Sequence, residues 1–358
     1  MSGLLLYCRP GFEKDLANEI QDKAGALEAF GYPQLKVNDG YIVYQCYEPD
    51  QADLLAKKLP LTSLVFARQM FACLEQVTEM DPGDRIGPIL AAVKDFPLCG
   101  ELRVEHPDTE KGKELSKLCR KFTVPLRQAL RKQGKLLEKE VTNRPTMHVF
   151  FTDSLAAYVG YSYSYNQSPL PGGILRLKFP SASPSRSTLK LEEAFQLFVP
   201  KDEHEKRLTS GMNAVDLGAC PGGWTYQLVR RGMFVTAIDN GAMADSLMDT
   251  GQVKHYAEDG FKFRPKKKNV HWLVCDMIEQ PQKVAKLMAT WVAEGECQEA
   301  MFNLKLPMKR RYDSVKESLA LIEEVMAKHG YSRYELQVKH LYHDREEVTA
   351  HLRLTPRN

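Results

Sequence analysis

Residues 214–224 constrain the fold more than any other part of this chain. They predict the end of a buried strand at 214–217, a turn rich in glycine, and a helix that begins near Thr225. Glycines at 218, 222 and 223 let the backbone turn tightly and approach a ligand, because no Cβ stands in the way. A strand, a glycine turn and a helix N-terminus together form a nucleotide-type site at the carboxyl edge of a parallel sheet. An ordinary strand-to-helix turn in an α/β domain is the plain alternative.

The spacing of the glycine turn separates it from two common phosphate-binding motifs. It matches neither the Gly-x-Gly-x-x-Gly of dinucleotide sites nor the Gly-x-x-x-x-Gly-Lys-Ser/Thr of phosphate-binding loops. Residues 216–223 are instead Asp-Leu-Gly-Ala-Cys-Pro-Gly-Gly. This run resembles the first motif of S-adenosylmethionine-dependent methyltransferases, in the form that RNA 2'-O-ribose methyltransferases use.

Length and composition set the frame for this domain. A chain of 358 residues predicts two or three domains, and 43% hydrophobic residues suffice for ordinary cores. No apolar run is long enough for a membrane span, and charged residues follow the short apolar run at 4–8, so we expect no signal peptide. Eight cysteines without a Cys-x-x-Cys pair predict no zinc site, no disulfides and a cytoplasmic location. The formal charge of +3 means that affinity for nucleic acid has to come from local patches.

The first block, residues 1–75, predicts a ferredoxin-like domain. The tripeptide Asn-Asp-Gly at 38–40 is a hairpin signal, and apolar residues at 12, 16 and 20 share one helical face. The order strand-helix-strand-strand-helix-strand is that of the ferredoxin-like fold. The expected elements are a strand at 4–8, a helix at 11–25, strands at 34–37 and 41–46, a helix at 50–58 and a strand at 63–73.

The second block, residues 76–165, contains a strongly basic segment. Residues 111–145 hold eleven Lys and Arg against three Glu, a local charge of +8 that can neutralise several phosphates. A solvated helix face is the plain alternative. Residues 166–184, rich in Pro, Gly and Ser, predict a linker. The expected elements are a helix at 85–96, a strand at 100–105, two helices within 111–135 separated near 123–125, and strands at 147–151 and 156–162.

The third block, residues 185–358, alternates strands and helices and predicts a mostly parallel, Rossmann-like sheet. Asp239 closes the strand at 234–238, 23 residues after Asp216. An acidic residue at that spacing can accept hydrogen bonds from both ribose hydroxyls of a bound nucleoside, and a loop or helix-cap aspartate is the alternative. Asp259 follows the next strand and is a candidate for the adenine amino group, although Asp-Gly is also a plain turn.

Lysines and a carboxylate are expected at the same sheet edge. Asp276 follows the strand at 270–275 and Lys305 follows the strand at 299–304, so both emerge beside the glycine turn. Lys190 lies in the first turns of the helix that opens the block. These residue types suit methyl transfer to a ribose hydroxyl, because a lysine that becomes neutral can accept the hydroxyl proton. A second cation or partial burial lowers a lysine pKa toward that state, and no metal is required.

This set of residues resembles the catalytic tetrad of the FtsJ-like 2'-O-methyltransferases. That tetrad is Lys-Asp-Lys-Glu, and the matching positions are Lys190, Asp276, Lys305 and Glu347. The doubled glutamate at 346 and 347 leaves two candidates for the last position. Glu347 is preferred because it directly precedes the valine that opens the last strand.

The whole chain resembles the RlmM family, which methylates a cytidine 2'-O in bacterial 23S ribosomal RNA. The match is strongest over 185–354 and looser over 1–165. In that family a ferredoxin-like domain and an RNA-binding THUMP domain precede the methyltransferase. The resemblance implies S-adenosylmethionine as cofactor, 23S ribosomal RNA or a large-subunit assembly precursor as partner, a monomer, and Lys305 as general base. The cofactor site that it implies comprises Ser187, Cys220, Pro221, Gly222, Gly223, Asp239, Asp259 and Asp276.

Other classes of protein stay open on the sequence alone. A methyltransferase that acts on a base carbon needs a cysteine nucleophile, and Cys275 directly precedes Asp276, although a small core residue is the plainer interpretation. Amino-group methyltransferases show a Pro-Pro-aromatic turn after the fourth strand, which residues 276–281 lack. A non-catalytic RNA-binding protein would keep the basic segment but has no use for Lys190, Asp276 and Lys305 together.

Overall fold

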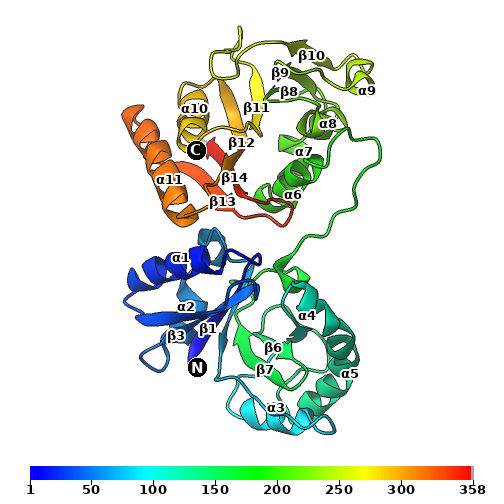
Figure 1. The fold of residues 1–358 in the computed structure, drawn as a ribbon, viewed down its shortest axis with the longest axis vertical. Coiled ribbons are helices and arrows are strands. Elements are labelled where there is room, and N and C mark those ends of the chain that lie inside the picture. Colours follow the sequence, from blue (N-terminus) through cyan, green and yellow to red (C-terminus); the bar gives the residue numbers. More distant parts are fainter. Residues whose placement is uncertain (356–358) are drawn as a thin grey trace. The chain divides into compact units, whose positions relative to one another are not determined.

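The computed structural model describes residues 1–355 of the chain. It divides into two compact units, Met1–Leu175 and Arg176–Asn358, each built around one seven-stranded sheet (Figure 1). Among the helices within 1–355, none is long and apolar enough to cross a membrane.

The first half of the N-terminal unit has the predicted ferredoxin-like order. Its strands are paired antiparallel in the spatial order β2-β3-β1-β4, and two helices pack on them. Leu4, Leu5 and Leu6 in β1 have no exposed surface, so this central strand is covered on both faces. The elements are β1 (Gly3–Tyr7), α1 (Glu13–Gly25), β2 (Gly31–Leu35), β3 (Tyr41–Cys46), α2 (Gln51–Lys58) and β4 (Gln69–Cys73).

The prediction of one long strand at 63–73 is wrong. A short 3-10 turn occupies Leu61–Ser63, and the strand β4 begins only at Gln69. The reason is the buried carboxylate of Glu19 in α1, which accepts hydrogen bonds from the backbone N–H groups of Val65 (2.5 Å) and Phe66 (2.9 Å). These two amides are satisfied by a side chain and therefore take no part in a strand ladder.

The second half of the N-terminal unit extends the same sheet. Strand β7 pairs with β4 through Ala72↔Tyr161 and Cys73↔Gly160, which gives the order β2-β3-β1-β4-β7-β6-β5. Phe122, Leu126 and Leu130 on one face of α5 are buried in a core shared with β6 and β7. The elements are α3 (Ile86–Ala92), β5 (Glu101–Glu105), α4 (Glu110–Glu114), α5 (Ser116–Lys132), β6 (Thr146–Asp153) and β7 (Ala156–Ser162).

The predicted helix break at 123–125 is also wrong. The interruption falls at Leu115, and α5 runs straight through Pro125. Proline has no N–H, so the Lys121 carbonyl lacks its usual partner in the helix. Both Pro125 and Lys121 are exposed, so this carbonyl lies on the side of the helix that water reaches. Burial of Phe122 and Leu126 on the opposite face keeps the helix docked and outweighs the lost hydrogen bond.

The first part of the predicted linker is fixed to the N-terminal unit. The buried side chain of Asn166 donates hydrogen bonds to the carbonyls of Ala56 and Leu59 and accepts one from the Leu61 N–H, all at 2.8 Å. The boundary between the two compact units comes later, between Leu175 and Arg176. The finer boundaries at 75, 165 and 184 stay predictions.

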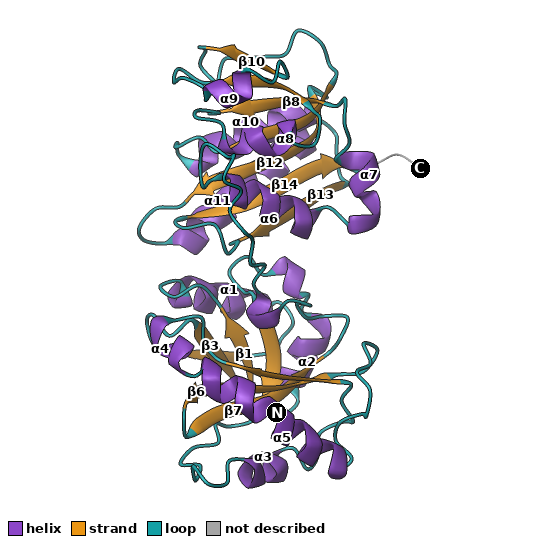
Figure 2. Ribbon diagram, turned by 90° about the vertical axis from the view of Figure 1, so that its right-hand side faces the viewer, coloured by secondary structure: helices purple, strands orange, loops and turns teal. Residues whose placement is uncertain are grey.

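The C-terminal unit is Rossmann-like, as predicted. Its sheet has the order β10-β9-β8-β11-β12-β14-β13, and β14 alone runs antiparallel to its neighbours β12 and β13. Helices α10 and α11 pack together on one face, and α6 and α8 on the other (Figures 1 and 2). The elements are α6 (Thr188–Phe198), α7 (His204–Arg207), β8 (Asn213–Leu217), α8 (Gly223–Val229), β9 (Phe234–Ile238), α9 (Asp245–Met248), β10 (Val253–Tyr256), β11 (Val270–Cys275), α10 (Pro281–Ala293), β12 (Cys297–Lys305), α11 (Arg311–Lys328), β13 (Tyr334–Lys339) and β14 (Glu347–Leu354).

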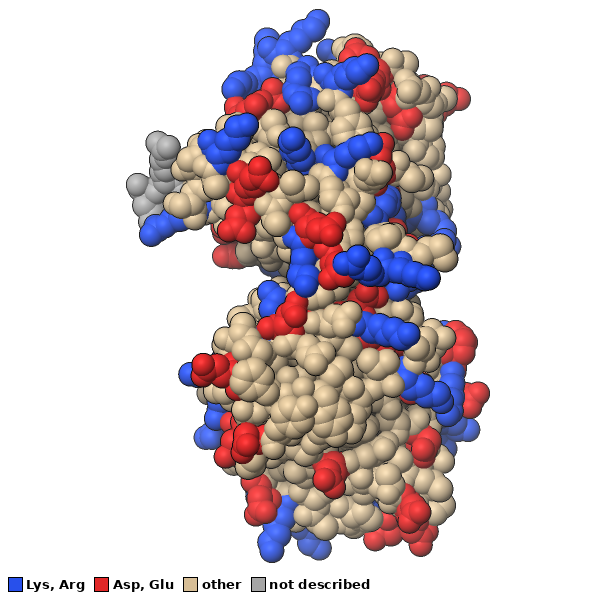
Figure 3. Space-filling model, turned by 60° about the vertical axis from the view of Figure 1, so that its left-hand side comes forward, with Lys and Arg blue, Asp and Glu red and all other residues tan. Residues whose placement is uncertain are grey.

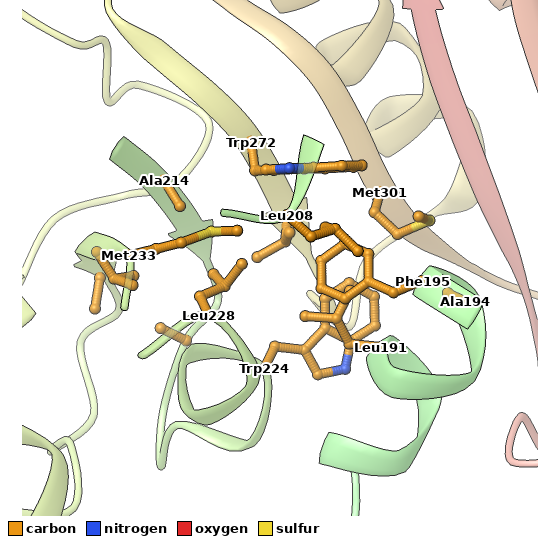
Figure 4. Close-up of a cluster of buried hydrophobic side chains, with 14 of the residues drawn as sticks. Leu191, Ala194, Phe195, Leu208, Ala214, Trp224, Leu228, Met233, Trp272 and Met301 are labelled. Carbon is orange, nitrogen blue, oxygen red and sulfur yellow. The ribbon is translucent and has the colours of Figure 1, made fainter. Parts of the chain in front are cut away.

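A buried apolar cluster fixes α6 and α8 against this sheet (Figure 4). Phe195 of α6 lies edge-on to Trp272 of β11, with ring centroids 5.0 Å apart. Trp224 and Leu228 of α8 join them from the other helix. Aromatic side chains bury large areas and prefer defined geometries, so this contact sets the position of α6 relative to the strand ends.

Candidate active site

The glycine turn lies where the order of the parallel strands reverses, between β8 and β11. In open α/β sheets the ligand crevice forms outside the carboxyl ends of the strands at this point. Gly218 and Gly222 have φ angles of +75° and +119°, which favour glycine. A Cβ on Gly223 would lie 2.2 Å from Ser187 Oγ, so the predicted cofactor residues Ser187 and Gly223 are packed directly together. Any larger residue at 223 would displace this contact.

Asp239 holds the turn in place. Its carboxylate follows β9 and accepts hydrogen bonds from the backbone N–H groups of Cys220 (3.0 Å) and Gly241 (2.8 Å). Each carboxylate oxygen can accept more than one hydrogen bond, so Asp239 retains capacity for ligand hydroxyls. The predicted ribose carboxylate is therefore also a support for the glycine turn.

A cavity of about 530 Å³ opens beside these groups. That volume is within the usual range for a small-molecule or cofactor site. Of the predicted cofactor residues, Cys220, Asp239, Asp259 and Asp276 line it, whereas Ser187 and the 221–223 segment lie outside its lining. The full lining is Gly218, Cys220, Ile238, Asp239, Asn240, Glu258, Asp259, Gly260, Phe261, Asp276, Met277, Ile278 and Glu279.

Asp259 lies in the loop after β10 rather than at the strand end. Its carboxylate is about half exposed and accepts a hydrogen bond from the Phe261 N–H (2.9 Å). Asp259 therefore fits both interpretations, because the same side chain closes a turn and lines the cavity.

Asp276 joins the cavity to the two lysines. It directly follows β11, and Lys305 is the last residue of the neighbouring strand β12. The Lys305 Nζ donates to Asp276 Oδ1 at 2.5 Å, and the Lys190 Nζ lies 3.5 Å from Oδ2. The amide of Asn303 also donates to Oδ1, at 2.8 Å. One carboxylate thus orients both lysines at the carboxyl edge of the sheet.

The structure distinguishes between the two adjacent glutamates. Glu347 pairs opposite Lys305 in the β12–β14 ladder, is buried, and forms an ion pair with Lys190. Glu346 is exposed and forms an ion pair with Arg311 at 2.8 Å instead. The order of contacts is therefore Lys305, Asp276, Lys190 and Glu347, with Glu346 outside this series.

Lys190 differs from the expectation that burial tunes these lysines toward neutrality. Burial does lower its pKa, but the carboxylates of Asp276 and Glu347 outweigh burial and raise the pKa above its usual value. Lys190 is consequently a permanent cation at neutral pH. Its positive charge offsets the two carboxylates, and the expectation of a proton-accepting lysine applies to Lys305 alone.

Sequence reasoning missed the groups that support Asp276. Asn303 Oδ1 is 2.7 Å from the Thr349 hydroxyl, and that hydroxyl is also 2.9 Å from the buried carboxyl group of Asp344. Burial raises the pKa of Asp344 well above its usual value, and the charges of Glu347 and Glu193 raise it further. Asn303 could have been suspected because it lies two residues before Lys305, but nothing in the sequence around Thr349 and Asp344 indicates that they belong to the site.

Asp216 is a buried acid whose properties sequence reasoning also missed. The Thr225 hydroxyl donates to its Oδ2 at 2.7 Å, and Oδ1 has no hydrogen-bond partner within the described residues. Burial raises the pKa of Asp216 to about 7, and the charges of Asp276 and Asp239 add to this effect against the Thr225 hydrogen bond. Its position at the end of β8, directly before the glycine turn, was the available signal.

Cys275 fits the core interpretation. Its side chain has no exposed surface, and burial raises the pKa of the thiol to about 12. A thiol with that pKa is protonated at neutral pH and is a poor nucleophile. Within residues 1–355, no group of three or more His, Cys, Asp and Glu side chains is arranged to hold a metal ion.

The C-terminal unit is that of an FtsJ-like methyltransferase, because the FtsJ-like methyltransferase family matches residues 184–340. The RlmM ferredoxin-like domain matches residues 1–71, and the N-terminal domain of ribosomal RNA large subunit methyltransferase M matches 84–163. The chain is 64% identical over 354 residues to ribosomal RNA large subunit methyltransferase M of Pseudoalteromonas atlantica, covering 99% of both chains. It is 59% identical to the protein of the same name from Photobacterium profundum, covering 99% of this chain and 98% of that one. The chain therefore belongs to the ribosomal RNA large subunit methyltransferase M family, RlmM.

Proposed function

We propose that this protein transfers a methyl group from S-adenosylmethionine to the 2'-oxygen of a cytidine in 23S ribosomal RNA. The main support for this proposal is the continuous contact of Lys305, Asp276 and Lys190 beside a cavity large enough for a cofactor. A lysine at that edge is costly to desolvate unless a carboxylate pairs with it, and here one carboxylate serves both. Membership of the RlmM family supports RNA as the substrate class. The choice of a cytidine rests only on the resemblance of the sequence to that family.

The cavity would hold S-adenosylmethionine between the glycine turn and two carboxylates. Residues 220–223 would surround its methionine end, with Ser187 behind them, and Asp239 would accept its ribose hydroxyls. Asp259, which also lines the cavity, would receive the adenine amino group. Open hydrogen-bonding capacity on both carboxylates fits these roles.

Lys305 would act as the general base. The sulfonium of the cofactor makes its methyl group electrophilic without a metal. Asp276 fixes the Lys305 Nζ by the 2.5 Å hydrogen bond, so that once neutral it can accept the 2'-hydroxyl proton. Lys190 stays charged, forms an ion pair with Asp276, and is held in turn by Glu347. Much of the acceleration then comes from aligning the reacting atoms.

The substrate atom can be tested by removing it. We expect no methyl transfer to a 23S ribosomal RNA transcript in which every cytidine is replaced by 2'-deoxycytidine. A matched transcript with 2'-deoxyuridine in place of uridine should still be methylated, which controls for altered RNA structure. Equal methylation of both transcripts would show that the acceptor is not a cytidine 2'-oxygen.

The cofactor site has its own test. Asp239→Ala should weaken S-adenosylmethionine binding, since one or two charge-assisted hydrogen bonds are lost at about 1.5–3 kcal/mol each. Asp245→Ala, an exposed aspartate in α9 outside the cavity lining, is the matched control. Isothermal titration with S-adenosylmethionine measures both. Unchanged affinity in a folded Asp239→Ala protein would count against the site.

The N-terminal unit would select the RNA. Residues 76–165 would form the THUMP RNA-binding domain, with phosphates contacted by the basic segment at 111–145. Figure 3 shows one face of the molecule, on which Lys and Arg are interspersed with Asp and Glu. Positive charge is thus not uniform on that face, in line with a net charge of only +3.

We also propose that the protein is a cytoplasmic monomer that acts on 23S ribosomal RNA, either free or in a large-subunit precursor.

A further inference from the structure

Two large apolar side chains beside the active site are almost completely exposed. Ile278 is 92% exposed and Met308 is 90% exposed, whereas the next most exposed large apolar residue in the described chain, Tyr165, reaches 71%. A single exposed apolar residue needs no explanation. Two such residues at the same sheet edge need an explanation, because each lies in the loop that directly follows a proposed catalytic residue.

Their loops begin at neighbouring points. Strands β11 and β12 are parallel and paired, with Cys275 opposite Phe302, and Asp276 and Lys305 contact each other just beyond. An extended chain spans at most about 3.6 Å per residue. Ile278 therefore lies within about 7 Å of Asp276, and Met308 within about 11 Å of Lys305, measured between Cα atoms. Ile278 also lines the cavity.

The loop that carries Met308 is held in a defined conformation. At its start the Leu306 N–H donates to the Glu346 carbonyl at 2.7 Å, and at its end the Arg310 side chain donates to Asp313 at 2.8 Å. Arg310 has a φ angle of +56°, which is unfavourable for a residue with a side chain. Strain of this kind persists where surrounding structure enforces it, often at functional sites. Met308 is thus presented to solvent by a fixed loop.

The chemistry next to Met308 indicates the class of partner. Lys309 and Arg310 follow it directly and are exposed, so apolar contact surface and positive charge occur together. Proteins that hold an unstacked nucleotide combine these two features, with apolar or aromatic side chains against the base and cations near the phosphates. Arg310 is paired with Asp313, and S-adenosylmethionine, which carries a positive charge at sulfur, gives no reason for a further cation at Lys309.

We infer that Ile278 and Met308 hold the base of one unpaired target nucleotide at the mouth of the cavity, so that its ribose reaches Lys305. This inference rests on the proposed function and names its substrate class as unpaired RNA. A base in a duplex is stacked on both faces and offers no apolar face to these side chains, so the enzyme should reject paired targets. Lys309 would contact an adjacent phosphate.

The test uses full-length Ile278→Ala, Met308→Ala and the double variant. The control is Phe234→Ala: Phe234 is also large, apolar and 52% exposed, but it begins β9 and so lies at the opposite, amino edge of the sheet. We expect the double variant to raise the KM for an unmodified 23S ribosomal RNA transcript roughly 5- to 50-fold, because the apolar contact of two side chains with the base is lost. S-adenosylmethionine affinity should not change in Met308→Ala, because Met308 lies outside the cavity lining. The melting temperature should not change in any of the variants, and Met308→Leu should retain most of the RNA affinity.

A competition experiment checks the unpaired state. Single-stranded oligocytidylate should inhibit methylation by the wild-type protein more strongly than the same strand annealed to its complement, and the double variant should lose this preference. An unchanged RNA KM in the double variant would overturn the inference, as would equal inhibition by the two competitors in the wild type. Failure of the proposed function is distinguishable, because the wild-type protein would then not methylate a ribose at all.

Discussion

Asp276 accepts hydrogen bonds from Lys305 and Asn303 and forms an ion pair with Lys190, so three donors converge on one carboxylate. The two lysines have different surroundings. Lys190 has a second carboxylate, Glu347, and its pKa is raised, whereas Lys305 forms its ion pair with Asp276 alone within residues 1–355. This difference in surroundings is the reason for proposing Lys305, and not Lys190, as the general base.

Lys305→Arg should abolish methyl transfer while leaving S-adenosylmethionine affinity nearly unchanged. Arginine keeps the positive charge and the interaction with Asp276, but it cannot release its proton near neutral pH. Lys286→Arg, at an exposed lysine in α10, serves as the control and should retain full activity. Single-turnover methylation together with isothermal titration separates the two effects. Robust methylation by Lys305→Arg would exclude the general-base role.

Asp216→Asn should change how stability depends on pH. The folded pKa of Asp216 is about 7, above that of an aspartate in an unfolded chain, so the folded state binds the extra proton. The wild type therefore loses stability as pH rises from about 4 to about 7, by up to roughly 1.4 kcal/mol per pH unit from this group. Asparagine removes that loss, so the variant should gain stability relative to the wild type between about pH 5 and about pH 8.

Denaturant unfolding at about pH 5 and at about pH 8 measures this difference in stability. Thr290→Val, at a partly buried hydroxyl in α10, is a control that removes a polar group without a titrating proton. Parallel stability changes of wild type and Asp216→Asn with pH would show that Asp216 does not carry the proton.

At the scale of elements, the sequence predicted the helices, strands and turns whose pattern lies within the segment itself. The apolar run at 234–238 and the glycine turn after 217 indicated a strand and a strand-to-helix turn where the structure has them. The errors came from tertiary contacts. Glu19, more than forty residues away, removes Val65 from the strand ladder, and burial of Phe122 carries α5 through Pro125.

The same limit applies to the site. Asp276 and Lys305 could be placed at one edge because both end parallel strands. The choice between Glu346 and Glu347 depends on the β12–β14 register, and the Asn303–Thr349 hydrogen bond depends on it too. Pairing register between distant strands has no signature in either strand alone.

The basic segment at 111–145 is an element with a testable charge. Reversing four of its exposed cations should weaken RNA binding and flatten the dependence of log K on log salt by up to about one unit for each phosphate that is no longer neutralised. The matched control reverses four exposed lysines elsewhere in the N-terminal unit, and it should have a much smaller effect. Filter binding of the 23S ribosomal RNA transcript across a salt series reports both. The reversed residues are Lys117, Arg120, Lys121 and Lys139, and the control residues are Lys14, Lys36, Lys58 and Lys94. Equal effects of the two sets would mean that only net charge matters.

At the scale of the whole molecule, the cavity proposed for the cofactor and the basic segment belong to different compact units. Every residue that lines the cavity, and every member of the lysine-carboxylate series, lies within Arg176–Asn358. Binding of the cofactor should therefore need only this unit, whereas recognition of the RNA should need both.

A fragment comprising Arg176–Asn358 should bind S-adenosylmethionine with an affinity close to that of the full chain. It should bind the RNA transcript much more weakly, because the +8 segment is missing. Circular dichroism and thermal unfolding of the fragment serve as the folding control. If the folded fragment methylates the transcript at the full rate, RNA selection by the N-terminal unit is wrong.

Alkaline hydrolysis of the product shows whether the methyl group goes to a ribose oxygen, as proposed, or to a base. A 2'-O-methyl group removes the nucleophile that cleaves the adjacent phosphodiester in alkali, so that linkage survives. RNA methylated by the full-length protein with radioactive methyl groups and then hydrolysed in alkali should release the label in an uncleaved dinucleotide. Label recovered in mononucleotides would show that a base is the acceptor and would contradict the role of Lys305 as the base for a ribose hydroxyl.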